Sequence, residues 1–149
     1  VDSLCALSVD QFNSMKDVIM DETLTRRARH AVYESQRTIP AVSALRANNL
    51  ARFGALMTAS HESLRDDYEI SCDEINLLVD LALQIPVVLG SRITGAGFGG
   101  CTVSIVKKDA ISEFKRTLYR QYRERTRNKA EFYIVEVGDG ARMLNILAD

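Results

Sequence analysis

The chain has few cysteines, no long apolar run and almost no excess of charge, and each absence excludes a class of protein. Its three cysteines, Cys5, Cys72 and Cys101, show neither C-x-x-C nor Cys/His spacing. We therefore expect free thiols in a reducing compartment, and neither a disulfide framework nor a zinc site. The apolar runs are far shorter than the roughly 18 residues of a membrane span, and no basic-then-apolar leader opens the sequence. We expect a soluble, cytoplasmic protein without a membrane partner.

The charge balance limits the partners of the chain, and its length limits the number of domains. The 149 residues carry 19 basic and 20 acidic side chains, a formal net charge of -1, which argues against a general polyanion binder. A chain of this length can bury about 68–70% of its unfolded surface in one core. We expect residues 1–149 to form a single domain. The start at Val1, without an initiator methionine, suggests a processed chain or a piece of a longer one.

Apolar residues at three- and four-residue steps predict helices in the first third of the chain. A short helix is expected around 10–19 and a longer amphipathic helix from Leu24 to Ile39. Because proline lacks a backbone donor and clashes with the preceding turn, we expect a kink or a restart at Pro40. The second segment would run to Ala47.

Two further helices are expected before the first strand. Asn48-Asn49 offers a turn and an N-cap for an apolar stripe from Leu50 to Leu64. Ser71 and Glu74 have the spacing of a capping box, which opens a helix through Ile85 that Pro86 ends.

The second half of the chain changes to strand-like periodicity. Alternation over 87–93 and 101–106 predicts two antiparallel strands that each bury one face. Asp109 is expected to cap a helix, Phe132–Val137 to form a third strand, and Gly138-Asp-Gly140 to turn the chain into a tail. The fold class is α+β, with long helices on one face of a small, mostly antiparallel sheet, and the last four elements resemble part of a ferredoxin-like plait.

The helix after Asp109 has one apolar and one basic side. Its apolar positions are expected to point inward, and its cations suggest RNA or an acidic partner. However, its aromatic residues lie mostly with the buried stripe and do not alternate with the cations, so we expect no nucleic-acid partner. The apolar positions are Ile111, Phe114, Leu118 and Tyr122. The cations are Lys115, Arg116, Arg120, Arg123, Arg125 and Arg127, and Glu124 is the main acid that relieves their charge.

The loop between the two strands holds half of the glycines of the chain. Gly95, Gly97, Gly99 and Gly100 are four of eight, with Phe98 among them. Such clustering suits a backbone that needs positive φ, or a bare surface that a ligand or a neighbouring segment approaches closely. A phosphate- or ligand-facing role and a purely structural bend both remain open on this spacing.

Known phosphate-binding patterns do not fit this loop. Gly95, Gly97 and Gly100 satisfy G-x-G-x-x-G, but that motif should open a helix and here it precedes a strand. No Gly-Lys-Ser/Thr follows, which excludes a P-loop, and the H-R-D and D-F-G motifs of protein kinases are absent.

No catalytic constellation is found elsewhere. His30 lies near an apolar stripe, which is typical of a packing histidine. His61 fits either a general base or a solvated helix end. Asp66 and Asp67 are neighbours that project in different directions from a helix, so we expect no metal site there. The sequence thus predicts no catalytic residue and no metal ligand.

Three ordered motifs nevertheless resemble the carboxy-terminal half of the galactokinases, within the GHMP small-molecule kinase family. They are Arg27–Glu34, His61–Cys72 and Ile93–Val103, and the last resembles the third motif of that family. The resemblance runs from about Leu24 to Leu144. Asp73 departs from it where proline is usual, and Val87 where glycine is common.

The resemblance implies a parent enzyme that transfers the γ-phosphoryl group of Mg-ATP to the anomeric hydroxyl of galactose, giving galactose 1-phosphate. The sugar-recognition motif, the phosphate-binding second motif, and an aspartate and a basic residue near the sugar hydroxyl belong to the amino-terminal half, which this sequence lacks. The partner expected is therefore that missing lobe, with galactose, ATP and Mg²⁺ bound only in the full enzyme. The glycine loop would line the cleft through Thr94, Gly95, Ala96, Gly97, Phe98, Gly99 and Gly100.

The main hypothesis is one folded lobe of such a kinase, inactive by itself. One alternative is a non-catalytic regulatory module that senses sugar or ATP. Another is the equivalent lobe of a kinase for N-acetylgalactosamine, because the residues that choose the sugar lie mainly in the missing half.

Overall fold

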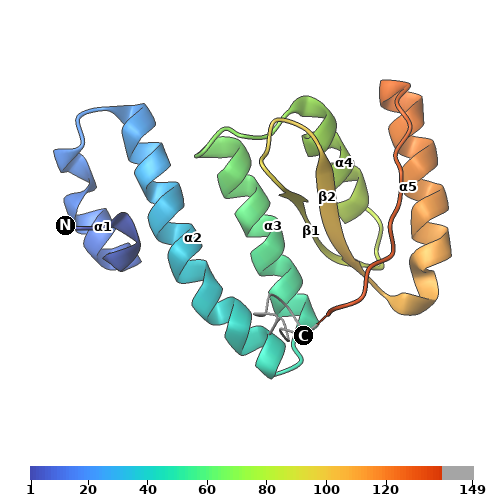
Figure 1. The fold of residues 1–149 in the computed structure, drawn as a ribbon, viewed down its shortest axis with the longest axis horizontal. Helices are drawn as coiled ribbons and strands as arrows, with labels where there is room; N and C mark the ends of the chain where they lie inside the picture. The colour runs from blue at the N-terminus through green and yellow to red at the C-terminus, as the bar shows by residue number, and fades with distance from the viewer. Residues whose placement is uncertain (139–149) are drawn as a thin grey trace, which may run out of the picture.

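The computed structural model describes residues 1–138 as a mostly helical α+β arrangement around a two-stranded sheet (Figure 1). Helices α1, α2 and α3 follow one another across the molecule, and α4 lies behind the sheet in this view. Helix α5 lies at the opposite end of the molecule from α1. Among the described residues, no helix is both long and apolar enough to cross a membrane. With η for a short 3-10 helix, the elements are η1 (Leu4–Ala6), α1 (Val9–Met15), η2 (Lys16–Val18), α2 (Glu22–Arg46), α3 (Leu50–Asp66), α4 (Asp73–Leu83), β1 (Val88–Thr94), β2 (Cys101–Val106), η3 (Lys108–Ala110) and α5 (Ile111–Thr126).

Helix α2 continues through Pro40, so of the two alternatives the restart is wrong, and a kink within the continuous helix stays a prediction. Proline inside a helix costs about 3 kcal/mol relative to alanine, and tertiary contacts on both sides of α2 offset this cost. At its start the Asp21 carboxylate accepts the amide of Leu24 at 2.8 Å. Ala28 and Val32 pack with Phe12 of α1, and the rest of the helix packs along α3.

Helix α3 crosses β1 with the two backbones in contact. A Cβ added at Gly54 would lie 2.0 Å from the Leu89 carbonyl oxygen, and one added at Gly90 would lie 2.2 Å from the Gly54 carbonyl oxygen. Only glycine permits so close an approach at both positions. The predicted cap of this helix is confirmed, because the Asn49 side chain accepts the Arg52 amide at 2.9 Å.

The start of α4 differs from the prediction. Its N-cap is Cys72, whose side chain makes no capping bond, and the Ser71 hydroxyl instead donates to Asn76 Oδ1 at 2.6 Å. The capping box is therefore absent. Asp73 and Glu74 occupy the first turn, where negative charge interacts favourably with the helix dipole.

The sheet is antiparallel, as predicted, but only β1 buries one face, and no residue of β2 is fully buried. Ser91 and Ile93 of β1 are buried, and Ser91 pairs with Ser104, whose hydroxyl lies 2.8 Å away. On β2, Cys101 and Val103 are exposed. The helices pack mainly against β1, so the apolar side of β2 is left uncovered within the described residues.

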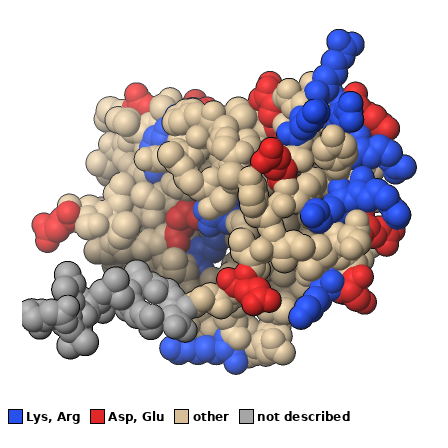
Figure 2. All heavy atoms as spheres, turned by 45° about the vertical axis from the view of Figure 1, so that its right-hand side comes forward, with Lys and Arg blue, Asp and Glu red and all other residues tan. Residues whose placement is uncertain are grey.

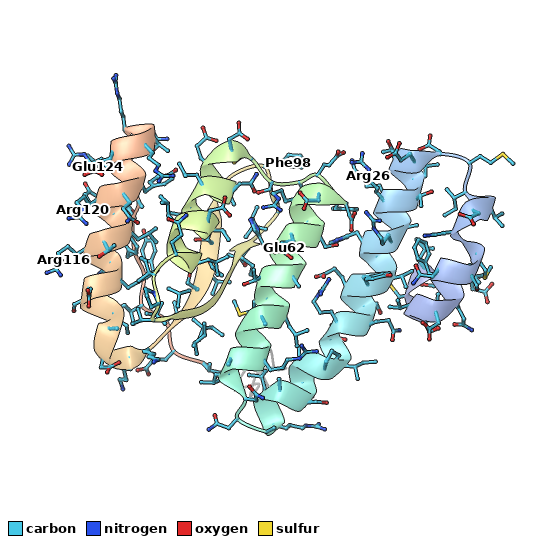
Figure 3. The ribbon with its side chains drawn as sticks, turned by 180° about the vertical axis from the view of Figure 1, so that it is seen from behind. Arg26, Glu62, Phe98, Arg116, Arg120 and Glu124 are labelled. Carbon is cyan, nitrogen blue, oxygen red and sulfur yellow. The ribbon has the colours of Figure 1, made fainter. Side chains whose placement is uncertain are left out.

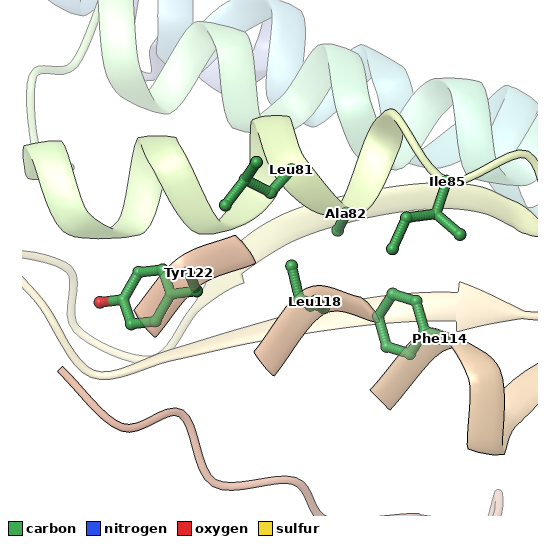
Figure 4. Packing of buried hydrophobic residues seen from close by; sticks show 6 residues of the cluster. All are labelled: Leu81, Ala82, Ile85, Phe114, Leu118 and Tyr122. Atoms are coloured by element: carbon green, nitrogen blue, oxygen red, sulfur yellow. The ribbon is translucent and has the colours of Figure 1, made fainter. Parts of the chain in front are cut away.

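Helix α5 packs against α4 through two facing apolar rows (Figure 4). The inward positions predicted for Phe114, Leu118 and Tyr122 are confirmed. Asp109 does not cap this helix; it lies in η3, and the N-cap is Ala110 without a side-chain bond. The buried residues of this cluster are Leu81, Ala82, Ile85, Phe114, Leu118 and Tyr122.

The predicted third strand is wrong for the described residues. Residues 128–138 have no regular secondary structure, although Phe132 packs edge-to-face on Phe114 with ring centroids 6.3 Å apart. The side chains that follow, such as Tyr133 and Val135, are both 77% exposed. Residues with strand propensity form a strand only where a neighbouring edge pairs with them. Asp139 and Gly140 of the predicted turn lie outside the described residues.

Candidate functional site

The candidate site is the loop that joins β1 to β2, and its backbone requires its glycines. Thr94 pairs with Cys101 at its base. The φ angles are +90° at Gly95, +87° at Gly97, +126° at Gly99 and +94° at Gly100. Because a left-handed conformation costs an L-residue roughly 1–2 kcal/mol, a loop with this many positive φ angles needs glycine at most of them.

One glycine of the loop is packed against a neighbouring segment. A Cβ added at Gly97 would lie 2.6 Å from the Ile70 carbonyl oxygen and 3.0 Å from the Ile70 side chain. The same carbonyl accepts the amide of Phe98 at 2.6 Å. Ile70 in turn packs on the buried cluster of Leu64, Ile75 and Ile93. The loop is thus fixed to the connection between α3 and α4.

The other three glycines are open. A Cβ added at Gly95, Gly99 or Gly100 would meet no atom within 4 Å. The side chain of Phe98 extends from the same loop and is 75% exposed (Figure 3). The loop therefore has one anchored position and a bare surface. A ligand or another protein segment could approach this backbone closely.

Arginines of α2 hold the α3–α4 connection to which the loop is anchored. Arg27 donates to the Asp67 carbonyl and to the Glu69 carboxylate, and Arg26 pairs with Glu69 at 2.9 Å. Arg29 pairs with the Asp67 carboxylate. The pKa of Glu69 is lowered, first by its hydrogen bond from Arg27. Two of the three sequence motifs, around Arg27 and around Asp67, therefore meet directly, and the second motif also contacts the glycine loop through Ile70.

His30 is a packing residue, as predicted. Its ring stacks on Tyr68 with centroids 4.6 Å apart, and its Nδ1 lies 2.9 Å from the Ser63 hydroxyl. Burial is the main cause that lowers its pKa, so the neutral form is favoured.

His61 is neither an accessible general base nor part of a solvated helix end, the two alternatives that the sequence left open. It lies inside α3, is 1% exposed, and its Nδ1 accepts the Ile93 amide at 3.4 Å. Burial lowers its pKa. Its Nε2 is buried without a hydrogen-bond partner among the described residues. With no solvent access it cannot act as a base at the loop surface, and it instead joins α3 to β1 one residue before Thr94.

The other candidate groups are engaged in local contacts. Asp66 pairs with Arg65 at 2.7 Å, and Asp67 with Arg29. No group of three or more His, Cys, Asp or Glu residues that could hold a metal occurs within residues 1–138. The three cysteines are free thiols in the structure.

Two of the hollows on the surface of residues 1–138 lie away from the loop. One lies beside α5 and the other between α2 and α3, with volumes of about 520 and 370 Å³. No residue of the glycine loop lines either of them. Neither of these two hollows therefore offers an enclosed site at the glycine loop.

Comparison with known proteins identifies the family to which this chain belongs. Residues 41–124, more than half of the chain, match the family model described as GHMP kinases C terminal. The chain belongs to the GHMP kinases. Its family domain includes α3, α4, both strands and most of α5, and so contains the glycine loop with its anchor.

Similar proteins extend the match to nearly all of this GHMP kinase chain. A galactokinase of Clostridium acetobutylicum is 52% identical over 145 residues, which are 97% of this chain and 37% of that protein. A galactokinase of Bacillus subtilis is 46% identical over 133 residues. A crystal structure of Lactococcus lactis galactokinase complexed with galactose superposes with a TM-score of 0.90 at 45% identity, again over 97% of this chain and 37% of the other. The chain thus spans little more than a third of the length of these relatives.

Proposed function

We propose that this chain is the carboxy-terminal lobe of an enzyme that phosphorylates galactose at its anomeric hydroxyl with ATP, giving galactose 1-phosphate. The observation that carries the proposal is the anchored glycine loop with an open outer surface, within a chain that is 52% identical to a galactokinase over nearly its whole length. The similar Lactococcus lactis enzyme, complexed with galactose, supports galactose as the acceptor.

The role proposed for the loop is to form one wall of the reaction cleft, from Thr94 to Gly100. Phosphoryl transfer depends mainly on positioning the reactants and stabilising negative charge that is spread over oxygens. A backbone held by the Phe98–Ile70 hydrogen bond, and bare at Gly95, Gly99 and Gly100, can approach a ligand or the other lobe without side chains between them. The loop itself contains no cation, acid or base.

ATP would supply the transferred γ-phosphoryl group. The open amides of the loop are compatible with a nearby phosphate, but the described residues fit Mg²⁺ poorly because they contain no carboxylate cluster. We therefore assign the metal ligands, the base and most of the nucleotide site to an amino-terminal lobe, which is the partner of this chain. The free thiols support a reducing, cytoplasmic location.

Calorimetry and a turnover assay on this chain test the proposal. We expect no measurable formation of galactose 1-phosphate from ATP and galactose, and no heat from either ligand. Robust turnover would show that one lobe is sufficient. Binding of galactose or ATP without turnover would favour a regulatory module, and the acceptor preference of the two-lobed protein decides between galactose and N-acetylgalactosamine.

A further inference from the structure

The positive charge of the chain is concentrated in its last helix. Residues 107–129 contain nine of the 19 lysines and arginines but only three of the 20 acids, a formal charge of +6 in a chain whose net charge is -1. The basic residues of the chain gather over α5 in the space-filling view (Figure 2). This concentration has no role in the function proposed above.

The helix presents these cations to solvent in a fixed direction. Phe114, Leu118 and Tyr122 are buried against α4, so the opposite side of α5 faces outward. Arg116 and Arg120 are exposed there, one helical turn apart, and extend away from the rest of the molecule (Figure 3). We call this side, formed by Lys115, Arg116, Arg120 and Arg123, the cationic face of α5.

The cationic face is neutralised only in part within the described residues, because Glu113 and Glu124 lie about one helical turn from Arg116 and Arg120 but form no ion pair with them. None of the five ion pairs among residues 1–138 uses a lysine or arginine of α5. Like charges four residues apart, such as Arg116 and Arg120, destabilise a helix. An anion bound between them would relieve this repulsion.

A groove of about 520 Å³ runs beside the cationic face. It is lined by apolar parts of Tyr119, Ala130 and Phe132, and by the aliphatic stems of Lys115, Arg116 and Arg120, whose charged ends are not part of the lining. Phe132 is held in place by its edge-to-face contact with Phe114. The surface therefore combines an apolar hollow with several cations, which suits a ligand that has both an apolar group and carboxylates.

We propose that this groove and the cationic face of α5 form a docking surface for an acidic protein segment that carries an aromatic or aliphatic side chain among its carboxylates. Arginine pairs with carboxylates through two parallel hydrogen bonds, and the hollow accommodates the apolar side chain.

The aromatic rings favour an acidic peptide over a nucleic acid. The Arg123 guanidinium lies over the Tyr119 ring, 6.0 Å from its centroid, and the Lys115 ammonium lies over the Phe132 ring at 5.8 Å. Single-stranded nucleic acids gain affinity from bases that stack on free aromatic faces. Here a cation of the chain itself already lies over one face of each ring, whereas carboxylates need no such stacking.

The test is fluorescence anisotropy on this chain with a labelled peptide of six acidic residues around one phenylalanine. We expect saturable binding that weakens at least tenfold between 50 and 300 mM salt, as roughly expected for contacts between exposed charges. The same peptide with alanine for phenylalanine should bind several-fold more weakly. A single-stranded oligonucleotide of equal charge, and vesicles that contain phosphatidylserine, should bind more weakly than the phenylalanine peptide.

Charge reversal locates the site. The variant Arg116→Glu/Arg120→Glu should lose at least tenfold in affinity, whereas Lys16→Glu/Arg52→Glu, with the same change of net charge at two exposed positions far from α5 in sequence, should lose less than twofold. If the first variant does not fold by circular dichroism, Arg116→Gln/Arg120→Gln replaces it. The proposal is overturned if the peptide does not bind, if both double variants weaken binding equally, or if the oligonucleotide or the vesicles bind more tightly.

Discussion

The amide of Phe98 donates a 2.6 Å hydrogen bond to the carbonyl of Ile70, and this bond joins the glycine loop to the connection between α3 and α4. Phe98 has a φ of +57°, a conformation that is costly for a residue with a Cβ, and the bond helps to hold it there. The glycine loop is therefore tied at Phe98 to a segment that is distant in sequence.

Alanine substitutions should separate the anchored glycine from an open one. Gly95 and Gly97 have nearly equal φ, so Gly95→Ala and Gly97→Ala share a backbone cost of roughly 1–2 kcal/mol. Only a Cβ at Gly97 also meets the Ile70 carbonyl, at 2.6 Å. We expect Gly97→Ala to lower the free energy of unfolding by about 1–3 kcal/mol more than Gly95→Ala, in urea titrations. Equal losses would mean that the loop is not held against Ile70.

Removing Arg27 should loosen the loop without unfolding the chain. Its guanidinium contacts the Asp67 carbonyl and the Glu69 carboxylate, and Ile70 follows directly. Because these groups are partly exposed, we expect Arg27→Ala to cost below about 2 kcal/mol of stability. Hydrogen exchange at the Phe98 amide should nevertheless become faster by more than the global stability predicts. Arg52→Ala, at an exposed position of α3, is the control and should leave that amide unchanged.

The crossing of α3 and β1 should tolerate no side chain. Gly54→Ala would place a methyl group 2.0 Å from the Leu89 carbonyl oxygen, and backbone atoms cannot turn aside as a side chain can. We expect a loss at or above the upper end of the roughly 1–3 kcal/mol typical of overpacking, measured by thermal and urea unfolding. Gly138→Ala, where an added Cβ meets no atom within 4 Å, should have almost no effect. A mild loss at Gly54 would contradict the close crossing.

Stability should fall in mild acid, with His61 as one cause. Burial lowers the pKa of His61 and of His30 in the folded chain, whereas an unfolded histidine titrates near about 6.5. The unfolded state therefore binds more protons below about pH 6.5, and the free energy of unfolding decreases as pH falls through that value and on towards the folded pKa. The slope is at most about 1.4 kcal/mol per pH unit for each histidine. The free energy of unfolding, measured in urea at pH 7.5, 6.5 and 5.5, should decrease less in His61→Gln than in the unchanged chain. An equal decrease in both would exclude His61 as a cause.

Local sequence signals predicted most of the fold. The three- and four-residue spacing of apolar residues predicted the positions of helices α2 to α5 to within a few residues. The sequence also identified Asn49 as an N-cap, and the alternation of residues predicted the antiparallel pair of strands. The errors arose where tertiary contacts outweigh local preference. Packing on both sides carries α2 through Pro40, and residues 132–137 lack a paired edge in spite of their composition.

The unusual backbone of the glycine loop was predictable from the sequence, but its contacts were not. Four glycines in seven residues indicated an unusual backbone, and all four have positive φ. Nothing in their spacing distinguishes Gly97 from the others, because the distinction depends on Ile70 in another segment. The burial of His61 was likewise hidden, since it depends on the packing of α3 against β1.

A hybrid enzyme tests the central claim most directly. This chain would replace the corresponding carboxy-terminal part of Lactococcus lactis galactokinase, to which it is 45% identical, and ATP-dependent formation of galactose 1-phosphate would be measured. We expect the hybrid to be active and this chain alone to be inactive. A folded hybrid without activity, or turnover by this chain alone, would contradict the assignment of this chain as one lobe of a galactose kinase.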